Sequence, residues 1–90
     1  MMKIREGFRM RKLGRDHIVV GEGLKTINFN KMIVLNETAA YLWESVFGRE
    51  FTKESLAALL KEQYEVDDQT ASRDAAAVAD KWLELGLTQE

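Results

Sequence analysis

The side chains that could carry out chemistry in this chain are few and far apart. His17 is the only histidine among the 90 residues, and there is no cysteine. Without a second histidine or a cysteine to join it, His17 cannot complete a zinc site of the usual kinds or a Cys-His catalytic pair. Asp67, Asp68 and Asp74 match no EF-hand spacing, and aspartate is common at helix N-termini, where it faces the positive end of the dipole. We therefore expect no catalytic residue, no bound metal and no enzyme activity.

One glycine pattern, Gly21-Glu22-Gly23, has the form of part of a phosphate-binding loop. It lacks the third glycine of a dinucleotide fingerprint, and no helical pattern follows it. A turn between strands is the simpler interpretation. We therefore expect no cofactor.

The composition limits the size and class of the protein. With 90 residues, of which 46% are hydrophobic and 31% charged, the chain can build one core, since domains typically contain about 100 to 150 residues. We expect a single domain over residues 1–90. No segment approaches the roughly 18 apolar residues of a membrane span, and the N-terminus lacks the apolar run of a signal peptide. A soluble, cytoplasmic protein without a membrane partner is expected.

Charge is distributed unevenly along the chain. Residues 1–35 contain eight Lys and Arg against three Asp and Glu, a net charge of +5. Residues 36–90 contain five against twelve, a net charge of −7, which brings the total to −2. The two parts should therefore present surfaces of opposite sign.

The second half of the chain has the pattern of three helices. Asn36 precedes the first, over Glu37–Phe47, and Thr52 precedes the second, which ends near Tyr64. Both are preferred N-cap residues because their side chains accept hydrogen bonds from free amides of the first turn. Apolar residues recur at spacings of three and four, so each helix should bury one face. In the first helix these residues are Ala39, Leu42, Trp43, Val46 and Phe47.

The third helix is expected from Asp67 or Asp68 to Leu85, with Gly86 as the left-handed residue that ends many helices. Its apolar seam, expected to face the core, consists of Ala71, Ala75, Val78, Trp82 and Leu85. The residues beside that seam are Ser72, Ala76, Ala79 and Leu83. Their small side chains would let an extended strand approach closely, or they merely widen the buried stripe. The sequence leaves both interpretations open.

The first 35 residues have the pattern of short strands. Apolar and polar residues alternate around Phe8 and Met10, and His17–Val20 is a β-branched run. A third strand is expected over residues 27–34, with a bulge or tight turn at Asn30-Lys31, where the alternation breaks. Strands followed by helices indicate an α+β class. We predict a winged-helix-like fold with three short N-terminal antiparallel strands followed by three helices.

A winged-helix plan invites comparison with DNA-binding domains. The helix that would enter the major groove, from Asp67 to Leu85, carries five acidic residues against two basic ones, a net charge of −3. Phosphate attraction requires a basic face, so this helix would repel DNA. A nucleic-acid-binding domain is therefore the alternative hypothesis, together with a purely structural interaction domain.

An extended peptide suits the predicted elements better. A three-stranded sheet has an open edge with unpaired amides and carbonyls, to which a peptide can add as a further strand. The same edge can pair with another copy of the chain, so a homo-oligomer is also compatible with the pattern.

Several motifs together resemble the coenzyme PQQ synthesis protein D (PqqD) family. The most specific is the run LNETAAYLWE at Leu35–Glu44. Looser matches follow at Gly48, Phe51–Leu56, Tyr64–Asp67, Asp74 and Leu85–Leu87. The resemblance covers roughly residues 8 to 88.

The resemblance implies a peptide chaperone or recognition element. Members of the family are winged-helix-like domains that bind the leader of a ribosomally made precursor peptide and present it to a modifying enzyme, commonly a radical S-adenosylmethionine (SAM) protein, as in PQQ biosynthesis. The peptide adds antiparallel to the third strand and lies against the third helix. Carried onto this chain, the implied peptide-binding residues are Ile27, Asn28, Phe29, Asn30, Lys31, Met32, Ile33, Val34, Ser72, Ala76, Ala79 and Leu83. Nothing in the chain identifies the precursor peptide, or PQQ as its product.

Overall fold

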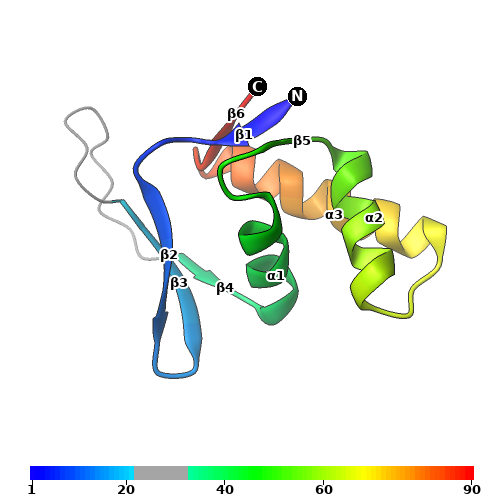
Figure 1. The fold of residues 1–90 in the computed structure, drawn as a ribbon, viewed down its shortest axis with the longest axis horizontal. Coiled ribbons are helices and arrows are strands. Elements are labelled where there is room, and N and C mark those ends of the chain that lie inside the picture. The colour runs from blue at the N-terminus through cyan, green and yellow to red at the C-terminus, as the bar shows by residue number, and fades with distance from the viewer. Residues whose placement is uncertain (22–32) are drawn as a thin grey trace.

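The fold joins a β-hairpin at one end to a group of three helices (Figure 1). The structure, a computed structural model, describes residues 1–21 and 33–90. The elements are β1 (Met2–Ile4), β2 (Phe8–Leu13), β3 (Asp16–Gly21), β4 (Ile33–Leu35), α1 (Glu37–Val46), β5 (Glu50–Phe51), α2 (Lys53–Gln63), α3 (Asp68–Glu84) and β6 (Thr88–Gln89). Antiparallel strands followed by three helices confirm the predicted α+β class. Within the described ranges, no helix is long and apolar enough to cross a membrane.

The strands form two small antiparallel sheets. In one, β2, β3 and β4 lie in that order, so that Val19 has Met10 on one side and Ile33 on the other. Gly14, with φ of 63°, occupies the first position of the two-residue turn between β2 and β3, as a type II′ hairpin requires. In the other sheet, β1 lies between β5 and β6. The residue pattern does not predict these three strands, because two or three residues are too few to show an alternation.

Helix α1 begins at its predicted cap. The Asn36 side chain accepts a hydrogen bond from the Ala39 backbone N–H at 2.7 Å. The expected buried face is confirmed except for Phe47, whose predicted burial is wrong: its side chain is 44% exposed. The helix ends at Val46, and the non-helical backbone of Phe47 turns the ring away from the core face.

Helices α2 and α3 also begin where their caps predict. Thr52 and Ser55 form a reciprocal capping box, in which each side chain accepts from the other's backbone N–H, at 3.0 and 2.7 Å. For α3, of the two candidate caps, Asp67 is the one used: its carboxylate accepts from the Thr70 N–H at 2.7 Å.

The C-terminal end of α3 closes with the expected glycine. Gly86 has φ of 78°, and its N–H donates to the Leu83 carbonyl at 3.1 Å. The Leu87 N–H donates to the Trp82 carbonyl at 2.9 Å, which completes a Schellman turn. This turn brings Leu87 back into the core, where it is fully buried.

The core is built around aromatic side chains from three elements. The rings of Trp43 and Trp82 lie edge to face with centroids 5.4 Å apart, and Phe51 lies 6.0 Å from Trp82 on another side. Edge-to-face contacts add to the hydrophobic gain of burying such large rings. Trp43 therefore fixes α1 against α3, and Phe51 fixes β5 to the same cluster.

Candidate functional site

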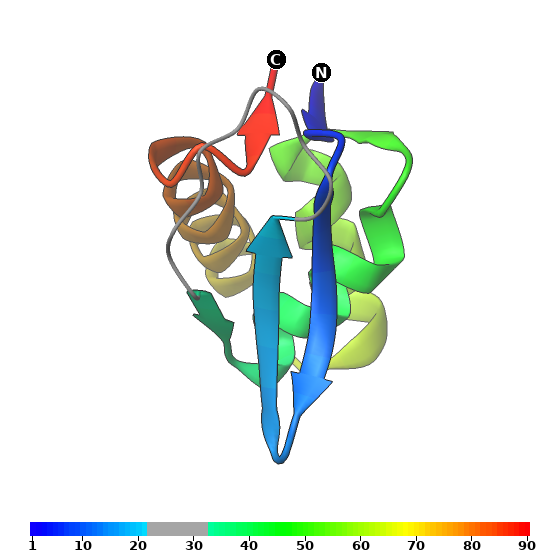
Figure 2. The ribbon, with the colours of Figure 1, turned by 90° about the vertical axis from the view of Figure 1, so that its left-hand side faces the viewer.

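A hollow of about 270 Å³ lies between strand β4 and helix α3. Figure 2 shows β4, in teal, beside α3, in orange and brown. The residues that line the hollow are Ile33, Val34, Leu35, Asn36, Ala39, Ala77, Val78, Lys81, Trp82 and Leu85. Most of these side chains are apolar, so the hollow suits an apolar side chain of a ligand better than a charged one.

Strand β4 forms one wall of this hollow and is an edge strand of the sheet that the described residues form. It pairs with β3 on one side, and in the described part of the chain no strand pairs with its other side. An edge strand presents backbone N–H and C=O groups that a further strand can satisfy. Val34, at the centre of β4, is 58% exposed. The side chain at the middle of the strand is therefore accessible.

Helix α3 forms the opposite wall. Ala77 and Lys81 are exposed, Val78 and Leu85 are half-buried, and Trp82 is buried beneath them. These positions recur at spacings of three and four, which places them on one side of the helix. The arrangement combines an apolar helix wall with a strand edge that is unpaired within residues 1–21 and 33–90. This is a geometry that receives an extended peptide.

Comparison with known proteins shows the family of this chain. The family model described as Coenzyme PQQ synthesis protein D (PqqD) matches residues 16–87. The chain belongs to the PqqD family. The matched range begins at β3 and ends just before β6, so it includes both walls of the hollow. No curated protein matches the chain.

A solved structure has the same fold as this PqqD-family chain. It is a lasso peptide synthetase B1 complexed with the leader peptide. The two chains share 20% sequence identity with a TM-score of 0.76, and the match covers 99% of this chain and 98% of the other. At this identity the likeness concerns the fold, and it extends over the whole PqqD-family domain.

The hollow contains only part of the predicted peptide-binding set. Ile33 and Val34 line it. The predicted residues Ile27, Asn28, Phe29, Asn30, Lys31 and Met32 lie outside the described residues, and so does the bulge expected at Asn30-Lys31. Contact of any of these residues with a peptide stays a prediction.

On α3 of this PqqD-family domain, the residues predicted to bind the peptide lie on a flank that faces away from the hollow. Ser72, Ala76, Ala79 and Leu83 are not among the residues that line it. Ala79 is fully buried, so its side chain has no surface to offer a ligand. Asp80, which lies between Ala76 and Leu83 on the helix surface, pairs with Lys53 of α2 at 2.9 Å. This flank therefore faces α2, and the opposite flank of α3 faces β4.

Two residues that the sequence assigns to the core pack against it and also line the hollow. Val78 and Leu85 are half-buried on its α3 wall. The fully buried line of α3 runs through Ala71, Ala75 and Ala79 to Trp82. The pattern of spacings alone does not distinguish the two lines. Side-chain size does not separate the two lines either, because the buried line includes Trp82 and the hollow is lined in part by Ala77.

Lys81 is the one charged residue of the hollow's lining. Other basic residues of α2 and α3 have carboxylate partners: Lys53 with Asp80, Lys61 with Asp68, and Arg73 with Asp74. Among the residues that the structure describes, no ion pair involves Lys81. An exposed ammonium group beside an apolar hollow favours a ligand that carries a carboxylate near an apolar side chain.

The hollow between β4 and α3 is lined by apolar side chains, the Asn36 amide and the Lys81 ammonium group. Its lining contains no carboxylate, thiol or imidazole. His17 lies on β3, opposite Leu35, and is not part of the lining. Within residues 1–21 and 33–90, no three metal-ligating side chains lie together.

Proposed function

We propose that this PqqD-family domain binds the leader of a ribosomally made precursor peptide and presents it to a modifying enzyme. The observation that carries the proposal is the apolar hollow between helix α3 and β4, whose second side pairs with no strand of the described residues. Membership of the family supports it, as does the fold shared with a protein solved in complex with a leader peptide.

The leader adds to β4 as a further strand. Backbone hydrogen bonds along the strand supply affinity that does not depend on sequence, and the side chains that point toward the sheet's core face supply specificity. Alternate residues of a strand point to the same face. Every second side chain of the leader therefore enters the hollow against Val78 and Leu85, and we expect these leader residues to be apolar.

Lys81 adds one polar requirement. Its ammonium group lies on the exposed rim of the α3 wall, so a leader with an acidic residue beside its apolar ones gains a charge contact. An exposed ion pair contributes about 0.2–1 kcal/mol. Lys81 therefore adjusts the choice among leaders, whereas the apolar contacts supply most of the affinity.

The presented leader serves an enzyme that is separate from the hollow. By the family resemblance this enzyme is a radical SAM protein, and we place the step in the cytoplasm. The domain contributes by holding the precursor at high local concentration beside the enzyme. It requires no catalytic group of its own for that role.

The proposal is tested by NMR titration of the ¹⁵N-labelled domain with a synthetic leader from a small precursor encoded beside its gene. The expected result is a saturable shift of the amides of Ile33, Val34, Val78 and Leu85 and of the Trp82 indole. A 12-base-pair duplex DNA serves as the competing ligand for the nucleic-acid alternative. Shifts that lie elsewhere, or stronger shifts with DNA than with the leader, would contradict the proposal.

A further inference from the structure

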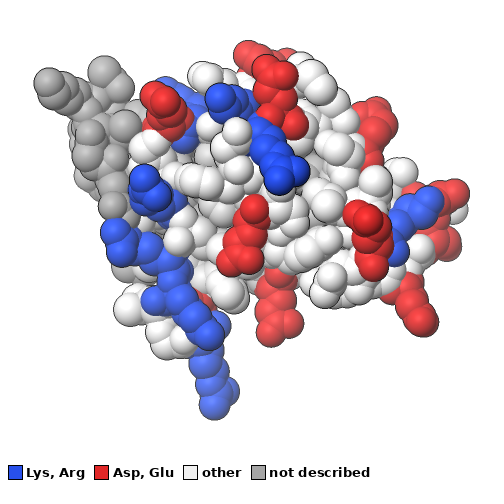
Figure 3. Space-filling view, in the orientation of Figure 1, with Lys and Arg blue, Asp and Glu red and all other residues white. Residues whose placement is uncertain are grey.

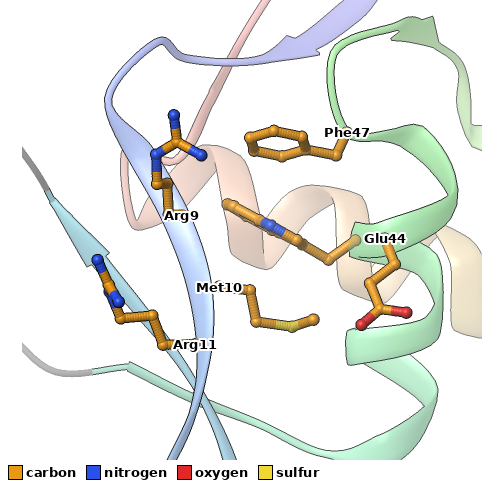
Figure 4. A pocket seen from close by; sticks show the side chains of 6 residues that line it. Arg9, Met10, Arg11, Glu44 and Phe47 are labelled. Carbon is orange, nitrogen blue, oxygen red and sulfur yellow. The ribbon is translucent and has the colours of Figure 1, made fainter.

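A second hollow, of about 410 Å³, lies between strand β2 and helix α1. Its lining consists of Arg9, Met10, Arg11, Trp43, Glu44 and Phe47. Figure 4 shows Glu44 and Phe47 extending from the α1 side and Arg9, Met10 and Arg11 lying along β2. This β2–α1 hollow shares no residue with the hollow between β4 and α3.

Trp43 brings an unsatisfied hydrogen-bond donor to the β2–α1 hollow. Its side chain is only 1% exposed, and its Nε1–H has no acceptor among the described residues. Buried donors are nearly always paired in folded proteins, and an unpaired one in a cavity wall is open to an acceptor from water or from a ligand. Met10, half-buried in the same lining, has a flexible unbranched side chain that can move when a ligand enters.

Phe47 gives the same hollow an apolar surface. Its ring is 44% exposed at the end of α1 and lies 6.4 Å, centroid to centroid, from Trp43. Exposing a large aromatic ring is unfavourable in water, and exposed aromatic rings beside arginine are enriched where proteins bind partners. Arg9, also exposed, lies on β2 across from this ring (Figure 4).

The charge around the β2–α1 hollow is mostly positive. Strand β2 contains Arg9, Arg11 and Lys12 and no acidic residue. Figure 3 shows Lys and Arg side chains in blue along the hairpin end of the molecule, whereas Asp and Glu in red dominate the helical end. Glu44 is the one acidic residue of the lining, so two arginines and one glutamate leave a net charge of +1. A negatively charged partner is attracted to this surface.

The β2–α1 hollow lies beside the strand farthest from β4. In the order β2, β3, β4, the two outer strands are separated by β3. A ligand beside β2 and a peptide beside β4 can therefore be bound at the same time. This geometry is what a domain needs if it holds a peptide and a protein partner together.

We propose that the β2–α1 hollow is a second docking site, which takes an acidic segment of a partner protein. A carboxylate of this segment accepts from the Arg9 guanidinium and from the Trp43 indole N–H, and a neighbouring apolar side chain packs on Phe47. The proposal goes beyond leader binding and stands on different residues.

The test uses a capped acidic hexapeptide, DEFDEL, and its uncharged counterpart, NQFNQL. The chain contains two tryptophans, so the ¹⁵N spectrum has two indole signals: Trp43 reports on the β2–α1 hollow and Trp82 on the β4–α3 hollow. The expected result is a saturable shift of the Trp43 indole with DEFDEL and a binding constant about tenfold weaker for NQFNQL, since charge-assisted hydrogen bonds are roughly twice as strong as neutral ones.

Two charge-reversal variants separate a site from a general attraction. Arg9→Glu removes a residue of the lining, whereas Arg15→Glu makes the same charge change at the exposed hairpin turn, outside the lining. Arg9→Glu should weaken DEFDEL binding about tenfold or more and Arg15→Glu less than about threefold. Phe47→Ala changes an exposed ring and should also weaken binding without unfolding the domain.

Several results would overturn the proposal. Equal weakening by Arg9→Glu and Arg15→Glu would show a general charge effect, and an unmoved Trp43 indole would show that nothing binds there. A shift of Trp82 alone would place the acidic peptide in the β4–α3 hollow. A Trp43 shift that appears on raising the protein concentration without peptide would identify a second copy of the chain as the occupant. When the Arg9→Glu variant is titrated with the leader, the shift of its Trp82 indole should match that of the unmodified protein. Failure of the acidic-peptide proposal can therefore be told apart from failure of the proposed function.

Discussion

The two flanks of helix α3 use small side chains for opposite purposes. On one side, Ala79 is fully buried, and the neighbouring Asp80 pairs with Lys53 of α2. On the other, Ala77 is exposed and lines the hollow beside β4. The same residue type therefore permits close helix packing at one position and leaves room for a ligand at another. The neighbouring element, not the size of the side chain, decides which role an alanine has.

The largest expected effect comes from enlarging the buried flank. Ala79→Leu inserts three carbons into a site with no free surface, and overpacking of this kind costs typically about 1–3 kcal/mol. We expect the free energy of unfolding, measured by urea denaturation, to fall by that amount. Ala77→Leu is the matched control on the exposed flank and should change it by less than about 0.5 kcal/mol. If Ala79→Leu keeps its stability but loses peptide binding, the Ala79 flank binds the peptide, and the assignment of that flank to helix packing is wrong.

The next effect is on peptide affinity. Ala77→Leu adds bulk at the hollow between β4 and α3, and we expect it to weaken leader binding about tenfold, or about 1.4 kcal/mol. Isothermal titration calorimetry measures this change. Ala58→Leu, at an exposed position of α2, makes the same substitution away from the hollow. If both variants bind the leader equally well, the α3 wall does not contact it.

A smaller effect is expected at the rim of the hollow. Lys81→Glu should weaken binding of a leader with an acidic residue by about 0.2–1 kcal/mol, or up to about fivefold. The loss should shrink as salt is added, because exposed charges are screened. Arg49→Glu, which changes the same charge outside the hollow, is the control. Equal losses in the two variants would mean that Lys81 acts through net charge alone.

The smallest effect concerns the start of α3, on which both flanks depend. The hydrogen bond from the Thr70 backbone N–H, reinforced by the Thr70 side chain, holds the pKa of the Asp67 carboxyl below its ordinary value. A lowered folded-state pKa contributes stability above the unfolded pKa, and this stability is lost as the pH falls through the folded value. The melting temperature of the unmodified protein should therefore exceed that of Asp67→Ala at neutral pH.

Melting temperatures measured at acidic pH supply the control for that prediction. The difference in melting temperature between the unmodified protein and Asp67→Ala should narrow as the pH falls below about 4, the ordinary pKa of an aspartate. Asp67→Asn keeps a good cap without a titrating group, so its advantage over Asp67→Ala should not depend on pH in this range. If the melting temperatures of the unmodified protein and of Asp67→Asn both differ from that of Asp67→Ala by amounts that do not change with pH, the carboxylate charge does not contribute to stability.

Helix ends could be predicted from the sequence because each depends on a local hydrogen bond. Asn36, Thr52 and Asp67 cap the helices that they were expected to cap. Strands β1, β5 and β6 could not be predicted, because they are stabilised by pairing between segments far apart in the chain. Local propensity contains no information about such pairing.

The sequence predicts which strand and which helix form the candidate site, but not the full set of residues that line it. A strand leading into the Asn36 cap and the third helix were both expected, and Ile33 and Val34 line the hollow. The expected helix residues lie on the flank of α3 that does not line the hollow, because Val78 and Ala79 lie on either side of the same apolar seam. Contact of the expected residues with a peptide stays a prediction. The ion pairs that join α2 to α3, Lys53 with Asp80 and Lys61 with Asp68, show which side of α3 is covered. The β2–α1 hollow had no counterpart in the sequence, since it depends on Phe47 turning outward beyond the end of α1.

The small sheet of β5, β1 and β6 has a consequence for how this domain can be built into larger proteins. Lys3 of β1 pairs with Gln89 of β6, and the Arg5 N–H donates to the Leu87 carbonyl at 2.9 Å. The two chain ends therefore lie side by side, as Figure 1 shows, and leave the molecule at one place. A domain with adjacent ends tolerates insertion into a loop of a host protein and circular permutation. Both hollows lie on other elements, so a host enzyme can carry the domain as an insert and keep both accessible.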